Sequence, residues 1–178
     1  MFAETAMPGH VILSHGSDSG PQATKVSVLA EVAQSLGYST ERPDYREADA
    51  LGYAGAVPPR VALLVQRIKA APQPPILVGS SMGAFVSGLA SLQAPCRALF
   101  LLALPITIPG VAQRFDMADV PAMLMHGFAD ELCPADAAVG FARERHMHTQ
   151  LLADGHRLAE HVDTIARQFR LFLEHLSS

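Results

Sequence analysis

Two adjacent serines stand in the stretch GSSMG (residues 79–83), between an apolar run and further apolar residues. The spacing Gly-x-Ser-x-Gly fits only with Ser81 at its centre. This pattern is typical of a sharp strand-to-helix turn that lifts the central hydroxyl to the end of a sheet. The dipole of the following helix would favour negative charge developing at Ser81. The spacing therefore predicts that Ser81 is a nucleophile and that Ser80 points aside into the packing of the turn.

A serine nucleophile needs a base, and the base needs an acid that orients it. Asp130, in HGFADELCP (residues 126–134), follows one apolar run, and His156, in DGH (residues 154–156), follows a later one. If both runs are strands of one parallel sheet, the two side chains reach the same edge as Ser81. We therefore predict Asp130 as the acid and His156 as the base.

Each of these assignments has an alternative. The alternative for Ser81 is a helix cap, because serine beside glycine is frequent at strand–helix junctions. Asp130 would serve as a cap for the helix after Pro134, although Asp136 is better placed for that role. Asp154 is the competing acid, and His161 is the competing base, expected on the solvated face of the last helix.

Acyl transfer also requires hydrogen-bond donors for the oxyanion that forms. The backbone N–H of Met82 is one candidate, and the N–H of Ser17, in the loop HGSDSG (residues 15–20), is the other. The alternative for this loop is a merely flexible connection. His15 and His126 stand at the ends of predicted strands, so we expect them to brace their loops rather than to act as bases.

Alternating apolar runs and helical periodicities predict the elements that would position these residues. The predicted strands cover residues 10–16, 38–45, 74–80, 98–105, 121–127 and 147–152. The predicted helices cover residues 22–36, 82–92, 137–146 and 157–176, and one more is opened by Pro58 and Pro59. The last helix is amphipathic, with an inward face predicted at Val162, Ile165, Phe169, Phe172 and Leu176.

Strands that alternate with helices indicate a parallel sheet covered on both faces, a three-layer αβα sandwich. The second and sixth strands are polar and the second contains Pro43, so both belong at the edges. The strand order 2-1-3-4-5-6 satisfies these preferences. Ligands of such sheets gather where the order reverses, here between the first and third strands. The loops predicted there contain Ser17 and Ser81.

Two connections are candidates for lining a substrate pocket, and ordinary surface loop is the alternative for both. Residues 45–57 follow the second strand and include Tyr45 and Tyr53. Residues 105–118 follow the fourth strand, and the connection through residue 120 is long enough for a loop with one helical turn. This second connection carries three further candidates, Arg114, Phe115 and Met117.

The composition is that of one globular domain, residues 1–178, with 49% hydrophobic and 17% charged residues. A net charge of −4 gives no reason to expect nucleic acid or an anionic membrane as partner. No His-Glu-x-x-His or Cys-x-x-Cys pattern indicates a metal, and no cofactor is expected. The first ten residues do not resemble a signal peptide and no run is long enough to span a membrane, so we expect a cytoplasmic protein.

Two cysteines, Cys96 and Cys133, are too few for a disulfide framework and fit free thiols in a reducing compartment. Cys133 is close to Asp130 in the sequence. We interpret it as a small buried apolar residue rather than as a second nucleophile.

HGSDSG, GSSMG, HGFADELCP and DGH, taken in this order, resemble the landmarks of the α/β-hydrolases, specifically the small lidless esterase-like members. The resemblance implies Ser81 as nucleophile, Asp130 as acid, His156 as base, and the amides of Ser17 and Met82 as the oxyanion hole. Two features of larger members are missing: the antiparallel strands before the first parallel strand, and the lid after residue 105. A missing lid favours small, accessible esters or thioesters as substrates.

The resulting hypothesis is a serine hydrolase of small acyl substrates, with a homodimer as one arrangement that would cover the open site. One alternative is a non-catalytic binding or scaffold protein that keeps the hydrolase fold. Another is a dinucleotide-binding domain, because a glycine-rich loop follows the first strand. GSDSGPQ does not match Gly-x-Gly-x-x-Gly, so the sequence gives this alternative little support.

Overall fold

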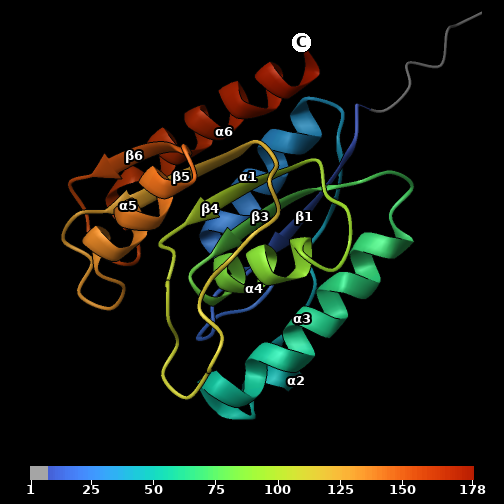
Figure 1. The fold of residues 1–178 in the computed structure, drawn as a ribbon. Helices are drawn as coiled ribbons and strands as arrows, with labels where there is room; N and C mark the ends of the chain where they lie inside the picture. The colour runs from blue at the N-terminus through green and yellow to red at the C-terminus, as the bar shows by residue number, and fades with distance from the viewer. Residues whose placement is uncertain (1–7) are drawn as a thin grey trace, which may run out of the picture.

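The computed structural model describes residues 8–178 and contains a six-stranded, all-parallel sheet (Figure 1). The strand order is β2-β1-β3-β4-β5-β6, which confirms the predicted order. The strands are β1 (His10–Ser14), β2 (Ser39–Glu41), β3 (Ile76–Ser80), β4 (Ala98–Leu102), β5 (Ala122–Gly127) and β6 (His148–Leu152). The helices are α1 (Thr24–Ser35), α2 (Arg46–Asp49), α3 (Gly52–Ala70), α4 (Met82–Ser91), α5 (Ala135–Glu144) and α6 (Val162–Ser177), with a 3-10 turn at Ala159–His161.

Helices cover both faces of the sheet, because successive side chains of its central strands point to opposite sides. Leu99 and Leu101 of β4 pack with residues of α3, α4 and α5 in one apolar core. Phe100 and Leu102 of the same strand pack with α1 and α6 in a second core. Strands β3 and β4 are buried along their whole length, whereas the edge strand β6 is mostly exposed. The predicted three-layer sandwich with polar edges is therefore confirmed.

Strand β2 lies at the sheet edge as predicted but is shorter than the predicted range 38–45. Its pairing with β1 ends at Glu41, so Pro43 lies in the loop beyond the strand. The chain leaves the sheet because Tyr45 is buried beside β1, where its hydroxyl lies 2.9 Å from Oγ of Ser14. This contact brings the following helices next to the loop after β1.

Helix α3 begins at Gly52, so Pro58 and Pro59 lie inside it and the predicted start was wrong. A proline inside a helix lacks the N–H that would bond the carbonyl four residues earlier, which normally marks a helix start. Here the residues around the prolines are buried against the core, including Val57 and Arg60. Tertiary packing outweighs the local preference and extends the helix toward its N-terminus.

The connection between β4 and β5, residues 103–121, contains no helix, so the predicted helical turn was wrong. Its shape is fixed by burial of Phe115, whose N–H donates to the carbonyl of Ile106 at 2.8 Å. The Phe115 ring fills the space beside Gly88 of α4, where a β-carbon would lie 2.1 Å from Cε2 of the ring. The connection is thus held against α4 and forms no lid over the sheet edge.

Helix α6 begins at Val162 rather than at residue 157, because Leu158 adopts a left-handed conformation with φ 54°. Of the predicted inward residues, Ile165 and Phe169 are fully buried, and the prediction missed the equally buried Leu173. The remaining predicted residues, which are half-buried, are Val162, Phe172 and Leu176.

Across residues 8–178, none of the helices combines the length and apolar character needed to cross a membrane. The prediction that the chain begins without a signal peptide rests mainly on residues 1–7. Those residues lie outside the described part of the chain.

Candidate active site

Ser81 sits in the turn between β3 and α4, with φ 55° and ψ −120°. A non-glycine residue in this conformation is strained, and strain of this kind is held only where surrounding structure imposes it. Gly79 and Gly83, on either side of Ser81, allow the surrounding backbone to approach the turn closely. A β-carbon at Gly79 would lie 2.3 Å from the Gly83 carbonyl oxygen, and one at Gly83 would lie 2.1 Å from the Ser14 carbonyl oxygen. The Gly-x-Ser-x-Gly spacing therefore reflects close packing of backbone on backbone.

The Ser81 hydroxyl is directed at an imidazole rather than at the helix backbone. Its Oγ lies 2.9 Å from Nε2 of His156 and makes no capping hydrogen bond to α4. The alternative of an ordinary helix cap therefore does not describe this side chain. Ser80, at the end of β3, is buried, in agreement with the prediction that it packs within the turn.

Asp130 lies in the turn after β5, with its carboxylate buried. Its Oδ2 is 2.8 Å from Nδ1 of His156. Its Oδ1 accepts hydrogen bonds from the backbone N–H groups of Leu132 (2.9 Å) and Cys133 (2.7 Å). Two amide donors and an imidazole stabilise the ionised carboxylate in a buried position. Asp130, His156 and Ser81 thus form one continuous hydrogen-bond chain across three loops at the same sheet edge.

The loop that carries His156 is fixed by close packing against the end of β5. A β-carbon at Gly127 would lie 2.4 Å from the carbonyl oxygen of Asp154, so only glycine allows this approach. The competing residues Asp154 and His161 pair with each other, with Oδ2 and Nδ1 2.9 Å apart. This hydrogen bond to His161 is the largest influence that lowers the pKa of Asp154. Asp154 and His161 thus bond each other within this loop, and neither takes part in the hydrogen-bond chain of Ser81.

His126, at the end of β5, also contacts Asp130, which the sequence did not indicate. Its Nδ1 accepts a hydrogen bond from the N–H of Leu104 (3.2 Å), so the proton is on Nε2. That Nε2–H donates to the carbonyl of Cys133 (2.7 Å) and lies 3.3 Å from Oδ2 of Asp130. The fully buried His126 therefore braces the Asp130 turn, the supporting role predicted for it.

The two amides predicted as oxyanion donors belong to elements beside Ser81. Met82 is the first residue of α4, so its N–H has no partner within the helix. Gly16, which precedes Ser17, packs on the nucleophile turn. A β-carbon at Gly16 would lie 3.6 Å from Cβ of Ser81.

The loop that contains Ser17 is held by a largely buried polar network, and no sequence pattern indicated its charged members, Asp49 and Arg60. Nε and Nη2 of Arg60 each lie 2.7 Å from a carboxylate oxygen of Asp49. The guanidinium also donates to the carbonyls of His15 and Gly16. In the sequence, Arg60 is a polar residue of an amphipathic helix, and nothing in the neighbouring residues distinguishes it from an arginine on the surface.

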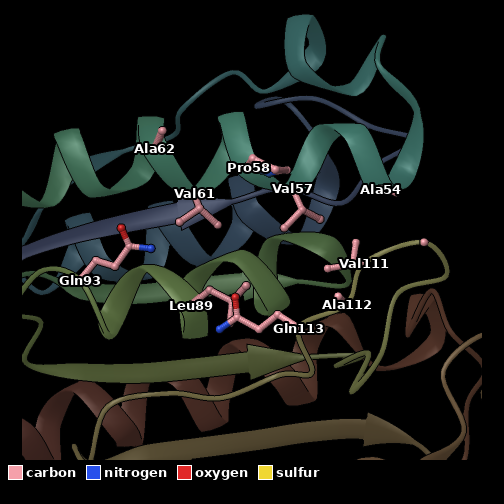
Figure 2. A pocket seen from close by; sticks show the side chains of 11 residues that line it. Ala54, Val57, Pro58, Val61, Ala62, Leu89, Gln93, Val111, Ala112 and Gln113 are labelled. Carbon is pink, nitrogen blue, oxygen red and sulfur yellow. The ribbon is translucent and has the colours of Figure 1, made fainter.

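Two hollows lie near the predicted pocket segments. A cavity of about 200 Å³ adjoins the candidate site, since Ser17 lines it together with Asp18, Asp49, Gly52, Tyr53 and Ala56. A larger cavity of about 460 Å³ lies between α3, α4 and residues 110–113, lined by Val57, Val61, Leu89 and Val111 among others (Figure 2). None of the five predicted site residues lines the larger cavity. Residues 49–56 therefore adjoin the candidate site, whereas Phe115 and Met117 are core residues.

Cys133 lies close to the hydrogen-bond chain, and its thiol, the Asp130 carboxylate and the His156 imidazole have ligand atoms within 4.8 Å of one another. Burial, reinforced by the charge of Asp130, raises the pKa of the Cys133 thiol to about 12. A thiol needs to ionise before it acts as nucleophile or metal ligand. This environment therefore opposes both functions for Cys133.

Accordingly, alkylation of Cys133 by iodoacetamide at pH 8 is expected to be at least 10-fold slower than alkylation of the same cysteine in the urea-unfolded protein. Cys133→Ser is expected to change the rate of any ester hydrolysis that the wild type catalyses by less than about twofold, because only backbone groups of this residue bond Asp130 and His126. Peptide mass spectrometry measures the first rate. Rapid alkylation of the folded protein together with loss of hydrolysis in the serine variant would contradict this view of Cys133.

Comparison with solved structures places the chain among known folds. A member of the α/β-hydrolase superfamily from Xanthomonas campestris pv. campestris is 42% identical and superimposes with a TM-score of 0.90, over 94% of this chain and 99% of that chain. An α/β serine hydrolase without lid from Xanthomonas campestris is 20% identical (TM-score 0.69; 96% and 81% covered). An α/β serine hydrolase homologue from Coxiella burnetii is 21% identical (TM-score 0.73; 93% and 85% covered).

Comparisons with protein-family models and with curated protein sequences gave no match. The first structural relative is similar over nearly the full length of both chains, and the other two support the same fold. The chain belongs to the α/β-hydrolase superfamily, and its fold is a minimal, lidless version of that architecture.

Proposed function

We propose that this protein is a serine hydrolase that cleaves small carboxylic esters or thioesters through an acyl-enzyme on Ser81. The observation that carries the proposal is the hydrogen-bond chain from Asp130 through His156 to Ser81, with spacings of 2.8 and 2.9 Å. A nucleophile within reach of a base, which is itself oriented by an acid, is the arrangement that activates a serine hydroxyl.

In the proposed reaction, Nε2 of His156 accepts the Ser81 proton while Oγ attacks the acyl carbonyl. The Nδ1–H of the imidazole donates to Asp130, which keeps the tautomer that leaves Nε2 free to accept. The amides of Ser17 and Met82 stabilise the tetrahedral oxyanion. His156 then protonates the leaving alcohol or thiol, and water attacks the acyl-enzyme by the same path in reverse.

The proposal of a small substrate is supported by the surroundings of the sheet edge. The β4–β5 connection is packed on α4 and provides no cover for a long acyl chain. Exposed apolar side chains nevertheless flank the site, Tyr53 in the first turn of α3 on one side and Phe128 and Leu132 in the loop after β5 on the other. These features favour small acyl groups with some apolar surface.

A hydrolysis series over aryl esters and thioesters of increasing acyl length tests this proposal. We expect kcat/KM to be highest for short acyl groups of about two to four carbons, and the acyl-enzyme to be detected by intact mass after rapid quench. A steady rise of kcat/KM toward long chains would contradict the small-substrate proposal. Folded protein that hydrolyses none of these substrates would favour a binding or scaffold function instead.

A further inference from the structure

The peptide group between Gly16 and Ser17 is held by an unusual number of donors on its carbonyl side. The Gly16 oxygen accepts hydrogen bonds from Nδ1 of His15 (2.7 Å), Nη2 of Arg60 (3.0 Å) and Oγ of Ser19 (3.2 Å). The N–H at the other end of this trans peptide belongs to Ser17 and points the opposite way. Fixing the carbonyl therefore fixes the direction of the Ser17 N–H.

Arg60 supplies a charged donor to this carbonyl, and its guanidinium is itself held by further hydrogen bonds. It is fully buried, and both of its hydrogen bonds to the Asp49 carboxylate are 2.7 Å long. Its Nη1 donates to the carbonyl of His15, also at 2.7 Å. A buried ion pair is costly to desolvate and is often replaceable by apolar residues without loss of stability. Stability alone therefore gives no reason to place this pair against two consecutive carbonyls of the loop.

His15 contributes a donor whose proton position the structure defines. The backbone N–H of Tyr45 donates to Nε2 of His15 (3.0 Å), so the ring proton is on Nδ1 and faces the Gly16 carbonyl. The ring is fully buried, and burial lowers its pKa below the ordinary value of 6.5. The neutral tautomer that supports the loop thus persists at neutral pH.

The held peptide lies directly beside the nucleophile. A β-carbon at Gly16 would be 3.6 Å from the carbonyl oxygen of Ser80 and 3.6 Å from Cβ of Ser81. If this peptide rotated by half a turn, its carbonyl oxygen would replace the Ser17 N–H and repel a developing oxyanion. The donors on the carbonyl oppose that rotation, and a positive charge there also polarises the N–H at the far end.

We propose that Arg60, oriented by Asp49, is a positioning residue for the oxyanion hole, which holds the Gly16–Ser17 peptide with its N–H turned toward the substrate. The inference rests on the proposed serine hydrolase function and extends it to a pair of residues on α3 and α2. The competing explanation is that the ion pair only anchors the first turns of α3 to the sheet.

The test compares the wild type with the double variant Arg60→Met/Asp49→Asn, which removes both charges together and leaves none unpaired. We expect kcat for a short aryl ester to fall by about 10²-fold, similar to the loss of one oxyanion donor, with KM within about twofold. Affinity for a trifluoromethyl ketone, whose adduct with Ser81 carries an oxyanion, should weaken in the same proportion. The midpoint of the pH–rate profile should not move, because His156 is untouched.

Arg67→Met, the same substitution on a half-exposed arginine of α3 paired with Glu41, is the matched control and should leave all four quantities unchanged. Arg60→Lys keeps the charge but lacks the planar fork, so kcat and ketone affinity should fall together by about 10-fold. Circular dichroism and thermal unfolding show whether the double variant folds. If it does not fold, Arg60→Lys replaces it as the test, and a fall of kcat together with ketone affinity supports the inference.

Four outcomes overturn the inference. A folded double variant that keeps kcat within twofold of the wild type shows that the pair only anchors α3, and Arg60→Lys with unchanged kcat shows the same. Loss of kcat without loss of ketone affinity places the defect outside the oxyanion hole. A wild type that neither hydrolyses esters nor binds the ketone overturns the proposed function as well, and is recognised before any variant is compared.

Discussion

Replacing Ser81 with alanine is expected to lower kcat for any ester that the wild type hydrolyses by roughly 10⁴-fold or more. The reason is that His156 would have no hydroxyl to deprotonate, although the oxyanion donors and the substrate site would remain. The same variant should show no covalent labelling by a fluorophosphonate probe, which needs a serine activated by a base. Steady-state kinetics and intact mass spectrometry measure the two effects separately.

Ser80→Ala is the matched control, because it makes the same chemical change, loss of a serine hydroxyl, at the neighbouring residue. Ser80 is buried at the end of β3, and the bond to Nε2 of His156 comes from its neighbour Ser81. Labelling should proceed at a rate within a few-fold of wild type. Equal labelling of the two alanine variants, or labelling lost only in Ser80→Ala, would show that the nucleophile has been assigned to the wrong residue.

Replacing Gly83 with alanine is expected to lower the free energy of unfolding by about 3 kcal/mol, at the upper end of the cost of overpacking a core. The added β-carbon would lie 2.1 Å from the carbonyl oxygen of Ser14 and 2.8 Å from that of His15. Both contacts are with backbone, in or next to the buried strand β1, and backbone there has no alternative position. Urea unfolding followed by circular dichroism measures the change.

Gly140→Ala provides the control for this prediction, because it makes the same chemical change inside helix α5. Apart from its chain neighbours and the nearby backbone of its own helix, no atom lies within 4 Å of the β-carbon position at Gly140. Alanine is a better helix former than glycine, so this variant should be more stable by about 0.5–1 kcal/mol. A Gly83→Ala variant as stable as the wild type would mean that α4 is not pressed against β1 as the structure describes.

The strand order was predictable because apolar and polar strands differ in the burial that they tolerate. The polar second and sixth segments occupy the edges, and the central strands are buried throughout. The same reasoning predicts that the loops of Ser81, Asp130 and His156 lie at one sheet edge, and there the three side chains are in contact. These residues were identifiable because their types and their positions after strands are both informative.

Other features depend on contacts between segments that are distant in the sequence. The prolines at 58 and 59 indicated a helix start, but burial of Val57 extends α3 to Gly52. Arg60 carries no signal of its own, since its partners are Asp49 and backbone carbonyls that follow β1. A period of 3.6 residues predicts which side of a helix faces inward, but not that one inward residue is a paired arginine.

The packing of Phe115 against Gly88 bears on whether the proposed hydrolysis would differ between dissolved substrate and substrate in micelles or droplets. A mobile apolar cover over an active site would give an oil–water interface something to bind and open, and the rate would then rise at the interface. Here the corresponding connection is anchored in the core by the buried Phe115 ring, which packs directly on Gly88 of α4. The rate should therefore follow dissolved substrate alone and saturate smoothly, with no jump when micelles or droplets form.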